Sequence, residues 1–206
     1  EAGDLSGVID NKVRHAITKL ADYHFVTNKD AYSRVIQMGV NPDTVWNCGS
    51  LDVEFALKVK PKRLIKEPYF VVLFHPIPGE DGKMLNDLIV EGSKKIVITS
   101  NKDYGVKTEG EEYDSRGYIN LISYAELLVG NSSSFLKESS MFGVPVIDVG
   151  ERQNNRLKPR NVLHISYNNV DLEGAINFQL HKKYPPDLIY YKPNTGREMA
   201  KIIKNL

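Results

Sequence analysis

The chain has 206 residues, of which 41% are hydrophobic and 26% are charged, and its formal net charge is +1. This composition is that of an ordinary globular protein, and the near-neutral balance excludes the charge footprint of a nucleic-acid or anionic-membrane partner. No stretch approaches the roughly 18 apolar residues of a membrane span. Cys48 is the single cysteine, so an intrachain disulfide and a cysteine-rich zinc site are excluded, and the cytoplasm is favoured.

The first part of the chain alternates helical and strand patterns. Apolar residues at helical spacing predict a helix from Asp10 to Asp22, with Asp10 as its N-cap. A buried strand, a second helix and a short strand leading into a third helix follow, over residues 23–27, 29–38, 44–50 and 52–59. The charged, proline-bounded segment 60–68 is the best linker candidate.

Beyond this linker the alternation continues. Strands are predicted at 69–74, 95–100, 127–129, 144–149 and 161–166. Helices are predicted at 82–93 and 118–125, from the serines at 132–134 to Gly143, and at 170–181 and 196–206. Strands separated by helices predict an α/β fold with a doubly wound parallel sheet, preceded by a partial second unit.

The segment "LVGNSSSFLKESSMFGVPVIDVG" (128–150) reads as strand, turn, helix and strand. Its serines therefore lie at the carboxyl end of a strand and at the start of a helix, where unpaired N–H groups favour an anion such as phosphate or diphosphate. The alternative is that one serine caps the helix and the others fill a polar turn.

His75 directly follows the buried strand "YFVVLF", at the same edge of the predicted sheet as the serines. A histidine at this position points into the ligand crevice, unless neighbouring turn carbonyls satisfy it. The other histidines lack metal-ligand spacing, so no metal site is predicted.

Four segments together resemble one known family. They are "EAGDLSGVIDNKVRHAITKLADYHFVTN", "FHPIP", "VGNSSSFLKESSMFGVPVIDVGERQ" and "NVLH". They are similar to the hydrolysing UDP-N-acetylglucosamine 2-epimerases, especially the branch that serves sialic acid synthesis, and the match spans nearly the whole chain. The resemblance implies a two-lobed glycosyltransferase-B-like fold and a reaction without metal or cofactor. UDP leaves UDP-GlcNAc to give 2-acetamidoglucal, and water adds to release N-acetylmannosamine.

The resemblance also implies roles for individual residues. Ser132 and Ser133, with Asn131, would hold the diphosphate, and Glu138 would accept hydrogen bonds from the ribose, although an isolated helix glutamate is ordinarily solvated. The remaining implied residues are Arg152 near the nucleotide, His75 as a donor to the leaving group, and Glu1 and Asp10 as acidic groups from the opposing lobe.

Two departures from the family pattern are expected to matter. The family has roughly a whole lobe before the position of Glu1, so we expect activity to need that lobe, fused or as a separate subunit. The interval between 100 and 118 is short, so we expect the C-terminal sheet to lack one strand.

The predicted division of the chain is 1–58 (end of the N-terminal lobe and connector), 59–190 (nucleotide-binding lobe) and 191–206 (closing helix). The protein is expected to form a homo-oligomer.

Two other functions fit the same residues. One is a nucleotide-sugar glycosyltransferase of the same fold, against which the segment "SGVIDNKVRHAITKLA" stands. The other is a UDP-binding module without catalytic activity. Among substrates of the epimerases, UDP-GlcNAc, a diacetamido-trideoxy sugar and a GDP-linked relative are not separated by these residues.

Overall fold

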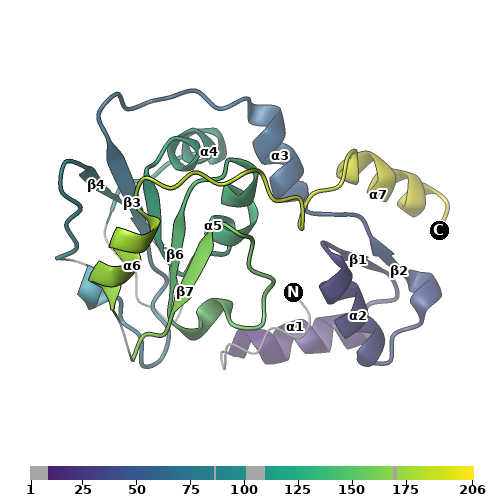
Figure 1. Cartoon of the computed structure of the whole chain (residues 1–206). Helices are drawn as coiled ribbons and strands as arrows, with labels where there is room; N and C mark the ends of the chain where they lie inside the picture. The colour runs from purple at the N-terminus through teal and green to yellow at the C-terminus, as the bar shows by residue number, and fades with distance from the viewer. Residues whose placement is uncertain (1–8, 86, 101–109, 169–170) are drawn as a thin grey trace.

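The computed structural model describes residues 9–85, 87–100, 110–168 and 171–206, with side chains described from residue 12 onward in the first range. In these ranges the chain forms one five-stranded and one two-stranded sheet, both parallel (Figure 1). The expected α/β class is therefore confirmed.

The larger sheet has the strand order β4-β3-β5-β6-β7. Its strands are apolar runs bounded by turn residues: β3 (Tyr69–Leu73), β4 (Lys94–Val97), β5 (Leu127–Gly130), β6 (Val146–Val149) and β7 (Val162–Ile165). Every residue of β3, β5 and β6 is buried, because helices cover both faces of the sheet. The order reverses between β3 and β5, which makes the carboxyl ends of these two strands the switch point of the sheet.

Alternate residues of β3 enter the two cores on either side of the sheet. Tyr69, Val71 and Leu73 pack with α3 (Leu51–Val59), α4 (Ser115–Ser123) and α5 (Ser133–Lys137). The intervening Phe70 and Val72 pack with α6 (Leu172–Gln179) on the opposite face (Figure 1). Successive side chains of a strand point to opposite faces of the sheet, so this one apolar run contributes to both cores.

The smaller unit holds α1 (Ile9–Leu20), β1 (His24–Val26), α2 (Lys29–Gln37) and β2 (Val45–Asn47), with a 3₁₀ turn at Pro42–Thr44. Asn28 caps α2, since its side chain accepts a hydrogen bond from the N–H of Ala31 at 2.8 Å. The core of this unit is small and consists of Val26, Ala31, Val35 and Val45.

The C-terminal segment returns from the larger sheet to the connector between the units (Figure 1). The Oγ1 of Thr195 donates to the carbonyl of Cys48 at 2.8 Å, and the N–H of Gly196 donates to the Oε2 of Glu54 at 2.9 Å. These bonds hold α7 (Thr195–Lys204) against α3. Ala56 and Val59 of α3 lie in the core of the larger sheet, so α3 belongs to that unit by packing.

The helix predicted at 82–93 is wrong. In the described part of this segment, the helical residues are a 3₁₀ turn at Lys83–Leu85. Gly82 has φ +76° and lies against the ring of Phe74, while the N–H of Ser93 closes a second turn on the carbonyl of Val90 at 3.0 Å. These turns bury Leu85, Leu88 and Val90 without helical spacing.

Two further expectations on helices need correction. Asp10 lies within α1, which starts at Ile9 in the described chain, so it is not the N-cap residue. The helix after the serines ends at Lys137 and is followed by a 3₁₀ turn at Ser139–Met141. There the hydroxyls of Ser139 and Ser140 donate to the carbonyls of Phe135 and Lys137, which competes with regular helix hydrogen bonding.

The short interval after β4 contributes a single bridge in its described part. Glu111 pairs in parallel with Ile98: its N–H donates to the carbonyl of Val97 at 2.7 Å, and its carbonyl accepts from Thr99 at 3.0 Å. Residues 101–109 lie outside the described chain. One bridge residue therefore stands at the sheet edge beside β4.

Candidate active site

The site lies at the carboxyl ends of β3 and β5, where the strand order of the larger sheet reverses. His75 follows β3, and Asn131 and Ser132 follow β5. Gly130 allows the two strand ends to approach, because its φ is +146° and an added Cβ would lie 2.0 Å from the carbonyl oxygen of Leu73. The structure therefore brings His75 close to the turn that holds the three serines, residues 132–134, as the sequence predicts. This turn is called the serine turn below.

Asn131 is fully buried and clamps His75. Its Oδ1 accepts from the N–H of His75 at 2.7 Å, and its Nδ2 donates to the carbonyl of His75 at 2.9 Å. Both polar groups of the amide are thus used within the protein. The structure places Asn131 behind the site, where it fixes the turns that carry His75 and Ser132.

The serine turn begins the short helix α5. Ser132 occupies the N-cap position without a side-chain capping bond, and its Oγ lies 2.9 Å from the Oγ of Ser134. Ser134 in turn contacts the phenolic hydroxyl of Tyr118. Ser133 is the first helical residue, where the backbone N–H has no partner within the helix. The turn therefore combines unpaired N–H groups with hydroxyls that can reorient toward an anion.

Glu138 is buried at the end of α5, with 8% of its surface exposed, and not on a solvated helix face. Its Oε2 has no hydrogen-bond partner among the described residues. Burial raises the pKa of this carboxyl to about 7, the neighbouring Lys137 ammonium lowers it, and Asp52 raises it. Lys137 is itself paired with Asp52 at 2.8 Å. The Oε2 of this buried carboxyl is therefore available to accept hydrogen bonds from a ligand.

One cavity of about 520 Å³ connects these groups. Its lining contains three of the predicted residues, His75, Ser132 and Glu138. The other lining residues are Asp52, Phe55, Leu73, Thr99, Tyr113, Ser115, Tyr118, Ile119 and Ser134. This volume is in the range of cavities that hold nucleotide-sized ligands. Ser133, Asn131 and Arg152 are not among the lining residues.

A groove of about 760 Å³ lies elsewhere, between residues 84–92 and the helix α6. Its lining mixes apolar side chains with Asp87, Glu91 and Glu173 and includes none of the predicted site residues. The groove therefore contains neither the histidine nor the serine hydroxyls that lie at the switch point.

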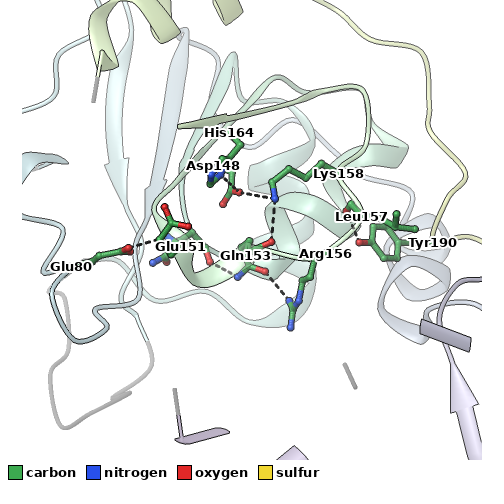
Figure 2. Close-up of polar contacts among 10 residues, drawn as sticks. Glu80, Asp148, Glu151, Gln153, Arg156, Leu157, Lys158, His164 and Tyr190 are labelled. Atoms are coloured by element: carbon green, nitrogen blue, oxygen red, sulfur yellow. Dashed lines mark hydrogen bonds and ion pairs between the residues drawn. The ribbon is translucent and has the colours of Figure 1, made fainter. Parts of the chain in front are cut away.

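Arg152 and Gln153 approach the site from the turn after β6, a 3₁₀ turn at Glu151–Gln153. The Nη1 of Arg152 and the Nε2 of Gln153 donate to the carbonyl of Asn131, at 3.1 and 2.6 Å. Gln153 also accepts from Arg156 and, through its carbonyl, from Lys158 (Figure 2). The side chain of Arg152 thus contacts the backbone of the turn that carries Asn131, and its predicted approach to the nucleotide stays a prediction.

The side chains of the two acidic residues predicted from the opposing lobe lie outside what the structure describes. Glu1 lies outside the described residues. Asp10 lies in α1, in the part whose side chains are not described.

Several cavity residues carry no signal in the sequence. Tyr118 lies at the start of an ordinary amphipathic helix, and burial raises the pKa of its phenol. Asp52 and Phe55 come from α3, which the sequence connects to the smaller unit. Only the packing of α3 and α4 on the sheet brings these side chains to the serine turn.

No group of three or more His, Cys, Asp and Glu side chains in the described ranges is arranged to hold a metal ion. No helix in the same ranges is long and apolar enough to cross a membrane.

A parallel α/β sheet with its cavity at the switch point, joined by a connector to a second parallel unit, defines the glycosyltransferase-B-like class. Solved structures with this fold include the UDP-GlcNAc 2-epimerase of Methanocaldococcus jannaschii in complex with UDP-GlcNAc and UDP, with TM-score 0.72 at 16% identity over 100% of this chain and 68% of that chain. The enzyme from Neisseria meningitidis bound to UDP-GlcNAc has TM-score 0.69 at 12% identity, over 100% and 69%.

The chain belongs to the UDP-N-acetylglucosamine 2-epimerase family, whose model matches residues 1–204. It is 32% identical to the UDP-N-acetylglucosamine 2-epimerase of Neisseria meningitidis, over 85% of this chain and 55% of that protein. It is 31% identical to the polysialic acid biosynthesis protein P7 of Escherichia coli, over 95% of this chain and 60% of that protein. The chain thus spans about half the length of the curated relatives it matches.

Proposed function

We propose that the chain is the C-terminal, nucleotide-binding part of a hydrolysing UDP-GlcNAc 2-epimerase. The observation that carries this proposal is the cavity at the switch point, which His75, Ser132 and Glu138 line together in a member of the epimerase family. In the reaction, the proton at carbon 2 and the UDP group at carbon 1 are removed to give 2-acetamidoglucal and UDP. Water then adds across the double bond and gives N-acetylmannosamine.

The nucleotide would bind through the serine turn and Glu138. Hydroxyls of Ser132 and Ser133 and the first N–H groups of α5 supply donors to the diphosphate, with Arg152 nearby. The unpartnered Oε2 of Glu138 accepts hydrogen bonds from the ribose. His75 donates to the leaving diphosphate, and Glu1 and Asp10 move the protons of elimination and hydration.

Two relatives support the hydrolysing subtype and the sialic acid branch. One is the Escherichia coli protein of polysialic acid biosynthesis, and the other is the hydrolyzing GDP/UDP-N,N'-diacetylbacillosamine 2-epimerase of Campylobacter jejuni, which is 30% identical over 82% of this chain. UDP-GlcNAc is the substrate proposed first, with the diacetamido sugars as alternatives. A homo-oligomer acting in the cytoplasm is part of the same proposal.

The proposal includes a requirement for an N-terminal lobe, in the same polypeptide or as a separate chain. The catalytic acids Glu1 and Asp10 must face the nucleotide across a closed cleft, and a misplacement of about 1 Å costs on the order of a hundredfold in rate. The uncovered apolar residues of α1, among them Ile17 and Leu20, provide a surface for that lobe.

Proton NMR of UDP-GlcNAc in deuterated water tests the activity. The 206-residue chain alone should be inactive. With the N-terminal region of a relative supplied, it should release UDP and N-acetylmannosamine carrying deuterium at carbon 2. Turnover by the chain alone would refute the requirement for the lobe. Failure of the completed protein on every candidate nucleotide sugar, with UDP binding retained, would favour the binding-module alternative.

Calorimetric titration with UDP tests the binding site. Replacing Ser132 and Ser133 by alanine removes two hydrogen bonds to a charged group, each about 1.5–3 kcal/mol. Ser132→Ala should have the larger effect, because Ser132 lines the cavity and Ser133 does not. Unchanged affinity in the double variant would refute the assignment of the serine turn.

A further inference from the structure

Gln153 is a buried side chain without an assigned role, although it touches the turn that carries the serines. It is 1% exposed, and its Nε2 donates to the carbonyl of Asn131 at 2.6 Å. The side chain of Asn131 in turn holds both backbone polar groups of His75, at 2.7 and 2.9 Å. Two amide side chains therefore connect the turn after β6 with the turns after β5 and β3.

The turn that carries Gln153 is anchored to buried carboxylates at both ends (Figure 2). At its start, the N–H of Glu151 donates to the Oε1 of Glu80 at 2.9 Å. At its end, Lys158 donates to the carbonyl of Gln153 at 3.2 Å and lies 3.8 Å from Asp148, which is fully buried in β6. The donor of Gln153 is consequently held in place from two sides.

We propose that Gln153 is the positioning residue of the site. Its amide fixes the turn that carries Asn131 through the hydrogen bond to the Asn131 carbonyl, and the two hydrogen bonds of the Asn131 side chain then fix the position of His75. In this role Gln153 touches no ligand and acts through the backbone of Asn131. The expected consequence for nucleotide affinity rests on the proposed function, whereas the effect on the His75 backbone does not.

Gln179 is a matched control for the loss of a buried amide. It is also 1% exposed, and its Nε2 donates to the carbonyls of Val146 and Asn161 at 2.9 and 3.1 Å, while its Oε1 accepts from Tyr184 at 2.5 Å. It lies at the amino ends of β6 and β7, so it performs comparable hydrogen bonding at the opposite edge of the same sheet. Replacing either glutamine by methionine keeps the length of the side chain and removes its polar bonds.

The experiment compares Gln153→Met and Gln179→Met in the full chain. Both variants should lose thermal stability by similar amounts. Only Gln153→Met should move the backbone amide resonance of His75 in a ¹H–¹⁵N NMR spectrum, because that N–H is bonded to Asn131. Only Gln153→Met should weaken UDP binding, by about tenfold or more, since small displacements of binding groups carry costs of this size. Gln153→Asn, which keeps the amide but withdraws it by one methylene, gives the same readouts if the methionine variant does not fold.

The outcomes separate the two claims. An unmoved His75 amide in the Gln153 variants would overturn the proposal, whatever UDP does. A moved amide with unchanged UDP affinity would overturn the role of Gln153 in binding. Equal loss of UDP affinity in Gln153→Met and Gln179→Met would show that the loss follows from lower stability of the whole fold, and it would also overturn the proposal. If the wild-type chain does not bind UDP, the proposed function fails, and the His75 amide alone decides whether Gln153 positions the turn.

Discussion

The two parallel sheets of this chain differ in how completely they are covered. The five-stranded sheet has a core on each face, and its strands β3, β5 and β6 are entirely buried. The two-stranded unit has a core of four buried residues and leaves apolar side chains of α1 in solvent, with Ile17 60% and Leu20 83% exposed. A parallel sheet needs cover on both faces, and two strands with two helices supply little of it.

Most of the buried apolar side chains of the described residues thus belong to the larger sheet. The larger sheet has a buried core on each face, and it also holds the cavity. The smaller unit has a core of four buried residues, and the C-terminal segment is hydrogen-bonded to Cys48, just after its second strand, and to Glu54 of α3. Four predictions examine this comparison.

Gly130→Ala should have the largest effect on the free energy of unfolding, because the added methyl group would push apart β3 and β5, which are paired in the five-stranded sheet. The new Cβ would lie 2.0 Å from the carbonyl of Leu73, at a φ of +146° that alanine avoids. We expect a loss of about 3 kcal/mol or more in the free energy of unfolding. Denaturant titration measures it. Gly79→Ala is the control: it has φ +85° but open space around the Cβ, so it should cost only about 1 kcal/mol.

Hydrogen exchange compares the two sheets directly. Amides of β3, β5 and β6 should open only on global unfolding, whereas those of β1 and β2 should open locally. We expect exchange at least about 100-fold faster in β1 and β2, which is about 2.7 kcal/mol less protection. Mass spectrometry on peptides from each sheet can measure this. Equal protection in both sheets would show that the chain unfolds as one unit.

Glu138→Gln tests an exception inside the well-covered region, a buried carboxyl whose pKa is raised to about 7. A raised pKa means that the folded state favours the neutral form. The free energy by which protonation of Glu138 stabilises the folded state is therefore fully present below pH 4.5, and it is lost as the pH rises through 7. Glutamine imitates the neutral form, so the variant should be more stable than wild type at pH 8, on the order of 2 kcal/mol, and equal to it below pH 4.5.

The same variant should bind UDP more weakly, because it loses the carboxylate. Stability and affinity would then change in opposite directions. Glu198→Gln, at an exposed Lys201 pair, is the control and should shift stability by no more than about 0.5 kcal/mol. A Glu138→Gln protein that is less stable at pH 8 would show that the carboxylate is structurally required.

Ile17→Lys should have the smallest effect on this chain. Ile17 is exposed, so the change should alter the free energy of unfolding by no more than about 0.5 kcal/mol. In the presence of the N-terminal region of a relative, the same lysine should reduce association or activity. Thermal denaturation and co-purification measure the two effects. A large loss in the chain alone would mean that α1 is covered already.

Much of the candidate site could be predicted from local patterns. His75 and the serine turn follow apolar strands, and the carboxyl ends of parallel strands meet at one edge of a sheet. The burial of Glu138 could not be predicted, because the cavity around it is formed with α3 and α4, which lie far from it in the sequence. The roles of Asn131 and Gln153 as hydrogen-bonding side chains behind the site were equally hidden, since amide residues in turns are ordinarily exposed.

The sequence by itself determined the α/β class, the positions of the strands, the strand-end location of His75 and Ser132, and the family. Those features depend on short-range periodicity and on motifs of adjacent residues. Only the tertiary structure decided that residues 82–93 form turns, that α3 contributes Asp52 to the cavity, and that Gln153 reaches Asn131. These outcomes depend on contacts between segments far apart in the chain, where burial and hydrogen bonding override local propensity.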